Sequence, residues 1–350
     1  MNTTQLDNET LQMLSSGALR VWLPVVYSMV VLISLPCNGV SFWLLCFHTR
    51  PKTPLTIFLI NLTLADLLLA FFLPFQIAYH VNHNHWVFGK GLCTFVTTVF
   101  YANMYCSILT MTCISVERYV GVLYPIRYAA WRDNRYAVAI CVVMWAITLI
   151  ILLPLEYSDL TFRVEELGIT TCFDVLKRSV FSDKGSWGIF IFSIITFLFF
   201  IPFTITVLCY TRLIVRLCRR EPKARGSGQK GRAVCLATLV VLVFVVCFTP
   251  SNITLLFHII LRLLYGRGCY EAYKVTLSLS CLNSCLDPFI FCFASKQFSS
   301  HLRQLLGGWR SRGPRDSIDR GLALGESGAK EGVSGKLIEG TVKEEPPTFS

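Results

Sequence analysis

Seven long apolar runs limit what this sequence can fold into. Each run is long enough to cross the hydrocarbon core of a bilayer, which takes about 20 helical residues. Strands of a membrane barrel would be about half as long and would alternate apolar and polar residues. The runs therefore predict membrane-spanning helices, because only helices and closed barrels satisfy the backbone in lipid. They cover Val21–Phe47, Leu55–Tyr79, Leu92–Leu123, Tyr136–Leu155, Trp187–Leu217, Ala233–Leu263 and Ala272–Phe293.

The composition favours the same class. Of the 350 residues, 54% are hydrophobic and only 15% are charged, which is too apolar for a soluble domain of this length. The net charge of +11 does not indicate nucleic-acid binding, because the lysines and arginines gather between the apolar runs. We therefore expect an all-α membrane protein, a seven-transmembrane helix bundle, with no nucleic-acid partner.

Basic residues follow the first, third, fifth and seventh runs, whereas the opposite loops mix acidic and basic residues. The positive-inside rule then predicts an extracellular N-terminus and a cytoplasmic C-terminus. Two glycosylation sequons, at Asn2 and Asn8, fit an extracellular tail.

The sequence divides into four parts on this interpretation. Residues 1–20 form an extracellular tail and residues 21–294 form the bundle. Residues 295–306 form a short amphipathic helix on the cytoplasmic membrane surface, because Phe298, Leu302, Leu305 and Leu306 recur at helical spacing. Residues 307–350 are rich in Gly, Ser, Lys and Glu, and we expect a disordered cytoplasmic tail.

Polar groups in the apolar runs are functional candidates, because burying them in lipid is costly. Glu117, Arg118 and Tyr119 end the third run. The Glu117–Arg118 pair is either an interfacial anchor or a latch that frees the arginine for another protein. Prolines in the runs, which remove backbone donors, predict kinks or hinges at Pro74, Pro154, Pro202, Pro250 and Pro288.

Taken together, these motifs resemble the rhodopsin-like G-protein-coupled receptors over roughly residues 21–306. The resemblance is carried by Asn38, Leu62–Asp66, Cys93, Glu117–Tyr119, Trp145, Cys172, Pro202, Tyr210, Cys247–Pro250 and Asp287–Phe291. Within that family the chain is similar to the branch of purinoceptors, lysophospholipid, cysteinyl-leukotriene and protease-activated receptors. Trp86–Gly89, Phe100–Tyr105 and Asp287-Pro288 carry this narrower likeness.

The resemblance implies a plasma-membrane receptor that activates heterotrimeric G proteins of the i, q or 12/13 families, with arrestin and receptor kinases acting at the tail. It implies a Cys93–Cys172 disulfide and leaves Cys269 without the second bridge of purinoceptors. Coupling and activation would involve Glu117, Arg118, Tyr119, Tyr210, Phe248, Pro250, Asp287, Pro288 and Phe291. A hydrated pocket that can hold sodium would be formed by Asp66, Ser107, Asn283, Ser284 and Asp287. No other cofactor is expected.

Two positions depart from the family pattern. Phe248 replaces the usual tryptophan of the sixth helix, and Phe291 replaces the usual tyrosine after the seventh-helix proline. The second change removes a hydroxyl that often bridges to Tyr210, so we expect a different active-state lock.

The ligand is expected to be an amphiphilic anion, because the outer halves of the helices combine aromatic groups with a few cations. The candidate residues are Tyr27, Gln76, His80, Tyr101, Asn103, Tyr105, Arg163, Asn252, His258, Arg262, Tyr273 and Lys274. Nucleotide-binding relatives carry basic groups where this chain has Thr97, Asn252 and Leu255. We therefore favour a lipid-bearing or conjugated anion, with a purine or pyrimidine nucleotide as the alternative.

Two other classes fit less well. A transporter would show an inverted repeat with broken half-length spans, and the sequence has neither. A membrane enzyme would show a nucleophile triad, a zinc-spaced cluster or a phosphate loop, and no such motif is recognisable. We therefore expect a receptor and not an enzyme.

Overall fold

The computed structural model describes residues 8–124, 126, 128, 133–156, 159–174, 184–219, 227–266 and 268–311. Within these residues, seven helical segments are long and apolar enough to cross a membrane. The predicted seven-helix membrane bundle is therefore confirmed. The segments are Gly17–His48, Pro54–Val81, Lys90–Leu123, Asn134–Pro154, Gly188–Arg219, Gly231–Tyr265 and Tyr270–Ala294.

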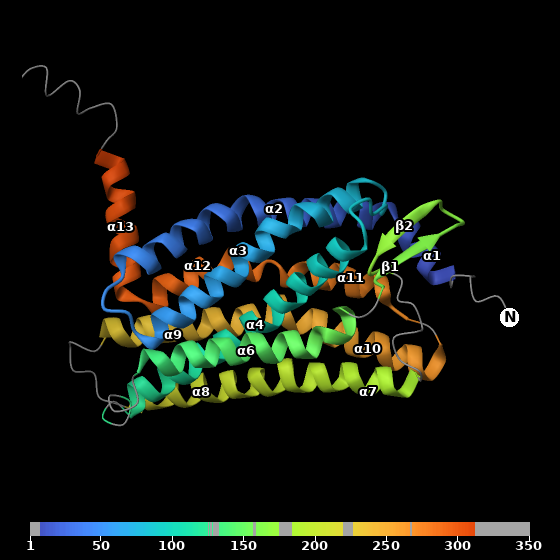
Figure 1. Ribbon diagram of the computed structural model, residues 1–350. Helices are drawn as coiled ribbons and strands as arrows, with labels where there is room; N and C mark the ends of the chain where they lie inside the picture. Colours follow the sequence, from blue (N-terminus) through green and yellow to red (C-terminus); the bar gives the residue numbers. More distant parts are fainter. Residues whose placement is uncertain are drawn as a thin grey trace, which may run out of the picture. The chain divides into compact units, whose positions relative to one another are not determined.

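The spans are built from helices whose ends match the predicted runs to within a few residues (Figure 1). The first four spans contain α2 (Gly17–Trp43), α3 (Pro54–Val81), α4 (Lys90–Leu123) and α6 (Asn134–Glu156). The fifth is α7 (Lys184–Ile195) with α8 (Ile201–Arg219), and the sixth is α9 (Ser227–Val243) with α10 (Thr249–Tyr265). The seventh is α11 (Tyr270–Ser280) with α12 (Asn283–Ala294).

Wider π-helical turns precede two of the predicted proline hinges. One turn, η3 (Thr196–Phe200), comes before Pro202, and another, η4 (Phe244–Phe248), comes before Pro250. A proline lacks the N–H that would bond four residues back, and its ring clashes with that carbonyl. In the second case the Thr249 hydroxyl donates to the Phe244 carbonyl at 2.8 Å and satisfies part of the loosened backbone. A third π-helical turn, η1 (Leu44–His48), ends the first span.

Helix α4 occupies the middle of the bundle, because it contacts α3, α6 and α8. Many apolar side chains elsewhere face outward, among them Leu32, Ile150 and Ile189, which are 75%, 63% and 70% exposed. Exposed apolar groups on this scale indicate a surface covered by lipid.

A two-stranded hairpin lies at one end of the bundle. Strand β1 (Thr161–Val164) pairs antiparallel with β2 (Ile169–Cys172), with Thr161 opposite Cys172. The Trp86 amide, in the α3–α4 connection, donates to the Thr170 carbonyl at 2.7 Å and attaches the hairpin to the bundle. We call this the disulfide end, because Cys172 is bonded to Cys93 there.

Both ends of the chain depart from the predicted boundaries. The N-terminal segment contains a helix, α1 (Asn8–Ser15), and the first span starts at Gly17, because Met13 and Leu14 pack into the bundle and are 5% and 1% exposed. Helix α13 (Lys296–Ser311) continues past the predicted end at residue 306, so residues 307–311 are helical and not disordered. Asn2 and the tail 312–350 lie outside the described residues, and Asn8 is the first residue of α1.

Candidate functional site

The disulfide joins the start of α4 to the end of β2. Cys93 and Cys172 are 79 residues apart in the sequence, and their Cα atoms are 5.8 Å apart. Both side chains are buried together with Tyr79, Trp86 and Leu160. The disulfide implied by the resemblance is therefore present, and it fixes the next residues of the chain over the end of the bundle.

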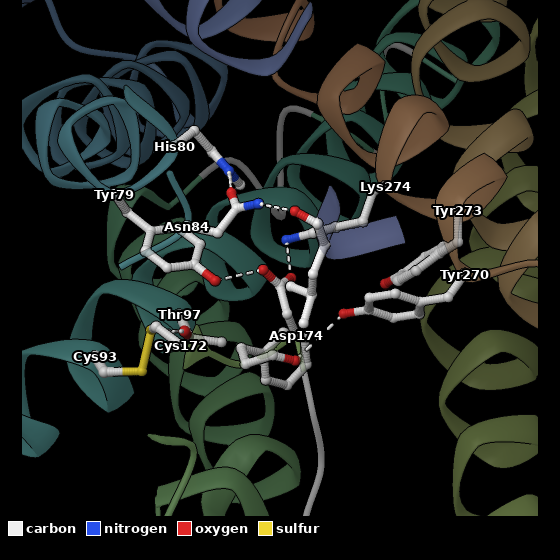
Figure 2. A network of polar contacts seen from close by, with 12 residues as sticks. Tyr79, His80, Asn84, Cys93, Thr97, Cys172, Asp174, Tyr270, Tyr273 and Lys274 are labelled. Carbon is white, nitrogen blue, oxygen red and sulfur yellow. Dashed lines mark hydrogen bonds and ion pairs between the residues drawn. A yellow bond between two sulfur atoms is a disulfide. The ribbon is translucent and has the colours of Figure 1, made fainter. Parts of the chain in front are cut away.

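A buried ion pair lies immediately beyond the disulfide (Figure 2). Phe173 adopts a left-handed backbone conformation with φ of 67°, which turns the chain inward. Asp174 then forms an ion pair with the Lys274 ammonium of α11, and it accepts a 2.6 Å hydrogen bond from the Tyr79 hydroxyl of α3. The Asp174 and Lys274 side chains are 2% and 9% exposed. Each charge would be costly to bury alone, so each holds the other in place.

Aromatic side chains surround this ion pair. The hydroxyls of Tyr101 and Tyr273 are 2.9 Å apart, and the Tyr270 hydroxyl donates to the Phe173 carbonyl at 3.3 Å. The Tyr27 ring lies 6.1 Å from the His80 ring. The result is a cation inside a largely apolar wall, which suits an amphiphilic anion.

Helix α1 covers the same region. The Leu14 carbonyl accepts a 3.1 Å hydrogen bond from the Asn84 amide and a 3.0 Å bond from Arg20. Asn84 in turn pairs with the His80 ring nitrogen Nδ1 at 2.8 Å. The Ser16 hydroxyl, at the end of α1, donates to Glu271 at 3.0 Å. We call the set of Tyr79, His80, Asn84, Asp174 and Lys274 the Asp174 cluster.

About half of the predicted ligand-binding residues lie at the Asp174 cluster or line the wall around it. These are Tyr27, His80, Tyr101, Tyr105, Tyr273 and Lys274, all buried. The sequence reasoning did not single out Tyr79, Asn84, Asp174 or Tyr270. One signal was available for Asp174, because it follows Cys172 by two residues and the disulfide had to carry it to this end.

The other predicted ligand residues lie outside the Asp174 cluster, and of these His258 borders its aromatic wall, with its ring centroid 5.6 Å from that of Tyr270. Gln76 lines a narrow apolar crevice between α3 and α4, and Asn103 donates to Asp66 at 3.2 Å deeper in the bundle. The Asn252 side-chain amide donates to the Phe248 carbonyl of its own span at 2.9 Å. His258 accepts from the Cys269 amide at 3.0 Å. Arg163 and Arg262 are exposed.

The five residues predicted to hold sodium are fully buried in the bundle interior. The Asp66 and Asp287 carboxyl groups lie within hydrogen-bonding reach of each other. Ser107 Oγ and both side-chain polar atoms of Asn283 have no hydrogen-bond partner among the described residues. The Ser284 hydroxyl donates to the Cys281 carbonyl at 2.8 Å. Buried side-chain oxygen atoms from three helices therefore gather here, and they form a donor set suited to a small hard cation.

At the opposite end, Arg118 is bound mainly to the seventh span. Its guanidinium donates to the Ala294 carbonyl at 2.5 Å, whereas its Nε is 3.7 Å from Glu117. Glu117 also accepts a hydrogen bond from the Tyr128 hydroxyl. The latch is therefore not the Glu117–Arg118 pair alone, as the motif suggested, because the end of α12 supplies the shorter bond. We call this the arginine end.

A second arginine binds the same helix end. Arg232 of α9 donates to the Cys292 carbonyl at 2.8 Å. The last turn of a helix leaves carbonyls without intrahelical partners and carries partial negative charge, so both arginines bind a suitable acceptor. Sequence reasoning used Arg232 only for orientation, because the distance to α12 depends on the packing of α9.

The remaining activation residues lie at the arginine end or between the two ends of the bundle. Tyr210, Phe248 and Phe291 are buried, and the Phe291 ring packs edge-on against Phe298 with centroids 5.9 Å apart. Phe291 therefore fills its site with an apolar contact. Pro250 follows η4, Asp287 and Pro288 lie within α12, and Tyr119 faces a cleft beside α8.

Comparison with known proteins agrees with this arrangement. The protein-family model described as "7 transmembrane receptor (rhodopsin family)" matches residues 17–291. The chain is 55% identical over 318 residues to the human S-geranylgeranyl-glutathione receptor P2RY8, covering 91% of this chain and 88% of that protein. It is 49% identical over 349 residues to a purinoceptor of Gallus gallus that carries the number 8 in its series, covering 96% and 97%.

A more distant relative is human proteinase-activated receptor 2, 37% identical over 303 residues, which cover 86% of this chain and 75% of that protein. On sequence alone, residues 168–176 resemble most closely the eighth member of the metabotropic purinoceptor series, which the two nearer relatives represent. The chain therefore belongs to the rhodopsin family of seven-transmembrane receptors and is a G-protein-coupled receptor of its purinoceptor branch.

Proposed function

We propose that this receptor binds an extracellular anion that carries a lipid chain, and that its ligand class is that of prenyl thioethers of glutathione. The supporting observation is Lys274, a buried cation inside a tyrosine wall and paired with a loop carboxylate. A carboxylate of the ligand can replace Asp174 on Lys274, while the prenyl chain packs on the aromatic side chains. The human relative named as an S-geranylgeranyl-glutathione receptor supports this ligand class.

We further propose that the receptor lies in the plasma membrane with its disulfide end outside the cell. The basic residues after the odd-numbered spans support this orientation. Asn2 and Asn8 would then be glycosylated. Phosphorylation of serines and threonines in the cytoplasmic tail by receptor kinases would recruit arrestin. The ligand is bound and released unchanged, so the receptor does not act on it as an enzyme.

In the proposed mechanism, the seventh span connects the two ends. Lys274 is on α11, and α12 continues the same span to the carbonyls that hold Arg118 and Arg232. A ligand that draws Lys274 away from Asp174 shifts the seventh span. This shift weakens the bonds from Arg118 and Arg232 to the end of α12. Helix α9 then swings about the η4–Pro250 hinge, and Arg118 becomes available to the G protein. The ligand favours an existing active conformation by the difference in its affinity for the two states.

We also propose that Asp66, Ser107, Asn283, Ser284 and Asp287 hold a sodium ion in the resting state. When bound, the ion offsets the negative charge of two buried carboxylates. The five residues come from α3, α4 and α12, so a bound ion would join three helices. In purified receptor, sodium is expected to raise the unfolding temperature relative to the larger cation N-methylglucamine. An equal increase in Asp66→Asn would contradict the assignment.

The ligand hypothesis is tested in cells that express the receptor with biosensors for the i, q and 12/13 G proteins. We expect a response to S-geranylgeranyl-glutathione and none to unprenylated glutathione. Loss of a charge-assisted hydrogen bond, worth about 1.5–3 kcal/mol, should raise the half-maximal concentration of Lys274→Gln roughly 10- to 100-fold.

Asp174→Asn is expected to lower the half-maximal concentration, because it removes the internal competitor for Lys274. Arg163→Gln is the matched control, because Arg163 is an exposed cation at the same end. A response to adenine or uridine nucleotides without a response to the prenyl conjugate would overturn the proposed ligand class.

A further inference from the structure

One face of α8 changes from apolar to basic along its length. Ile201, Ile205 and Leu208 are 43%, 38% and 52% exposed, and they are followed on the same face by Arg212 and Arg216. Residues three or four apart share a face of a helix, so these side chains form one continuous stripe. Its apolar part, Ile201 to Leu208, lies toward the membrane centre, and its basic part, Arg212 and Arg216, lies toward the arginine end.

The basic part of the stripe borders a cleft of about 210 Å³ between α8 and the end of α4. The α4 side contributes two aromatic groups, Tyr119 and Tyr124, whose rings are 6.1 Å apart. The cleft is lined by Tyr119, Leu123, Tyr124, Thr211, Arg212, Val215, Arg216 and Arg219. Three guanidinium groups and several hydroxyls are donors suited to a phosphate.

The charges of this cleft are not neutralised within the described part of the chain. The ion pairs among the described residues involve Lys90, Arg118 and Lys274, and none of them involves Arg212, Arg216 or Arg219 of α8. Arg212, Arg216 and Arg219 are also exposed. Three like charges on one helix face repel each other, so an anion that binds all three would stabilise the site.

We propose that this cleft binds the headgroup of an anionic phospholipid, with the acyl chains lying along Ile201, Ile205 and Leu208. At 1.5 Å per residue, the apolar part of the stripe reaches about 10 Å into the hydrocarbon from its basic end. A soluble phosphate would match the arginines but would leave this apolar stripe unused. In the orientation proposed above, the arginine end lies at the cytoplasmic leaflet, which is the leaflet rich in anionic lipid. The site is separate from the Asp174 cluster.

The experiment uses full-length receptor in nanodiscs of phosphatidylcholine, with and without about 5% phosphatidylinositol bisphosphate, and counts bound lipid by native mass spectrometry. The test variant is Arg212→Gln/Arg216→Gln/Arg219→Gln. At about 1 kcal/mol per cation near an anionic surface, binding should weaken about fivefold per arginine, or roughly 100-fold for three. The control is Arg50→Gln/Lys52→Gln/Arg135→Gln, which removes three exposed cations from other segments.

The expected result is loss of the bound lipid in the test variant and its retention in the control, with no displacement by an equal concentration of soluble inositol trisphosphate. Equal lipid binding in wild type and test variant would overturn the proposal. So would displacement by an equal concentration of the soluble headgroup, because the acyl chains would then contribute nothing to binding. Normal lipid binding with lost G-protein activation would assign the arginines to the G protein. None of these readouts requires the extracellular ligand, so failure here leaves the ligand hypothesis unaffected.

Discussion

Breaking the Asp174–Lys274 pair should destabilise the receptor more than removing both charges. In Lys274→Met the Asp174 carboxylate, 2% exposed, keeps only the hydrogen bond from Tyr79. Removing one partner of a buried pair costs about 3–5 kcal/mol, and the remaining hydrogen bond favours the lower value, about 3 kcal/mol. At roughly 2 °C per kcal/mol for a chain of this size, the unfolding temperature should fall by about 6 °C.

The same cost is expected for Asp174→Asn, because it leaves the Lys274 charge buried. The double variant Asp174→Asn/Lys274→Met should be more stable than either single variant, because no unpaired charge remains. Additive losses, about 12 °C in the double variant, would refute the ion pair.

Unfolding can be followed with a thiol-reactive dye in nanodiscs. Cys106, Cys141 and Cys247 are buried free cysteines that become reactive only when the bundle opens. The matched control is Lys90→Met, because Lys90 pairs with Asp159 at 2.8 Å but is 75% exposed. An exposed pair contributes little, so this control should shift the transition by no more than about 2 °C.

Three further predictions concern the two ends of the bundle. Arg118→Ala should abolish nucleotide exchange on the G protein while surface expression persists, and normal signalling would contradict the latch role. Arg232→Leu should raise basal exchange roughly fivefold, because it removes a part-buried bond worth about 1 kcal/mol that holds α9 to Cys292. Cys93→Ser should destabilise the receptor by at most about 4.5 kcal/mol, the loop-closure value for a separation of 79 residues from Cys172, and an unchanged unfolding temperature would contradict it.

Both arginine variants need a control at the same end of the bundle. Arg135→Leu serves, because Arg135 is exposed near the start of α6. It should leave basal and ligand-stimulated exchange unchanged. If Arg135→Leu raised basal exchange as much as Arg232→Leu, then general loss of positive charge, and not release of α12, would explain the effect.

The spans could be predicted from sequence because the bilayer sets one length that every apolar run must meet. The exceptions are informative. Helix α1 lies in a polar segment whose two apolar residues, Met13 and Leu14, find their partners only in the folded bundle. The hairpin β1–β2 was also missed, because four-residue strands give little periodicity. The π-helical turns depend on how the chain relaxes around Pro202 and Pro250.

The sequence predicted which types of residue form the candidate site, but it did not predict which of them pair with each other. Lys274 and the tyrosines were identified because aromatic groups and a few cations at the outer halves of the helices suit an amphiphilic anion. Their partner Asp174 lies in a loop, whose path no helical period describes. Asn103 was assigned to the ligand site, although it bonds to Asp66, because depth along α4 could not be judged from sequence.

The cover formed by α1 has a consequence for timing. Leu14 is anchored through its carbonyl by Asn84 and Arg20, and it lies over the same cluster that Asp174 closes from the loop. A molecule approaching from water must wait for these contacts to open, and one that has bound must wait again before it can escape. If the ligand binds at this cluster as proposed, its onset should be slow and its residence long, and shortening the chain to begin after Leu14 should hasten both.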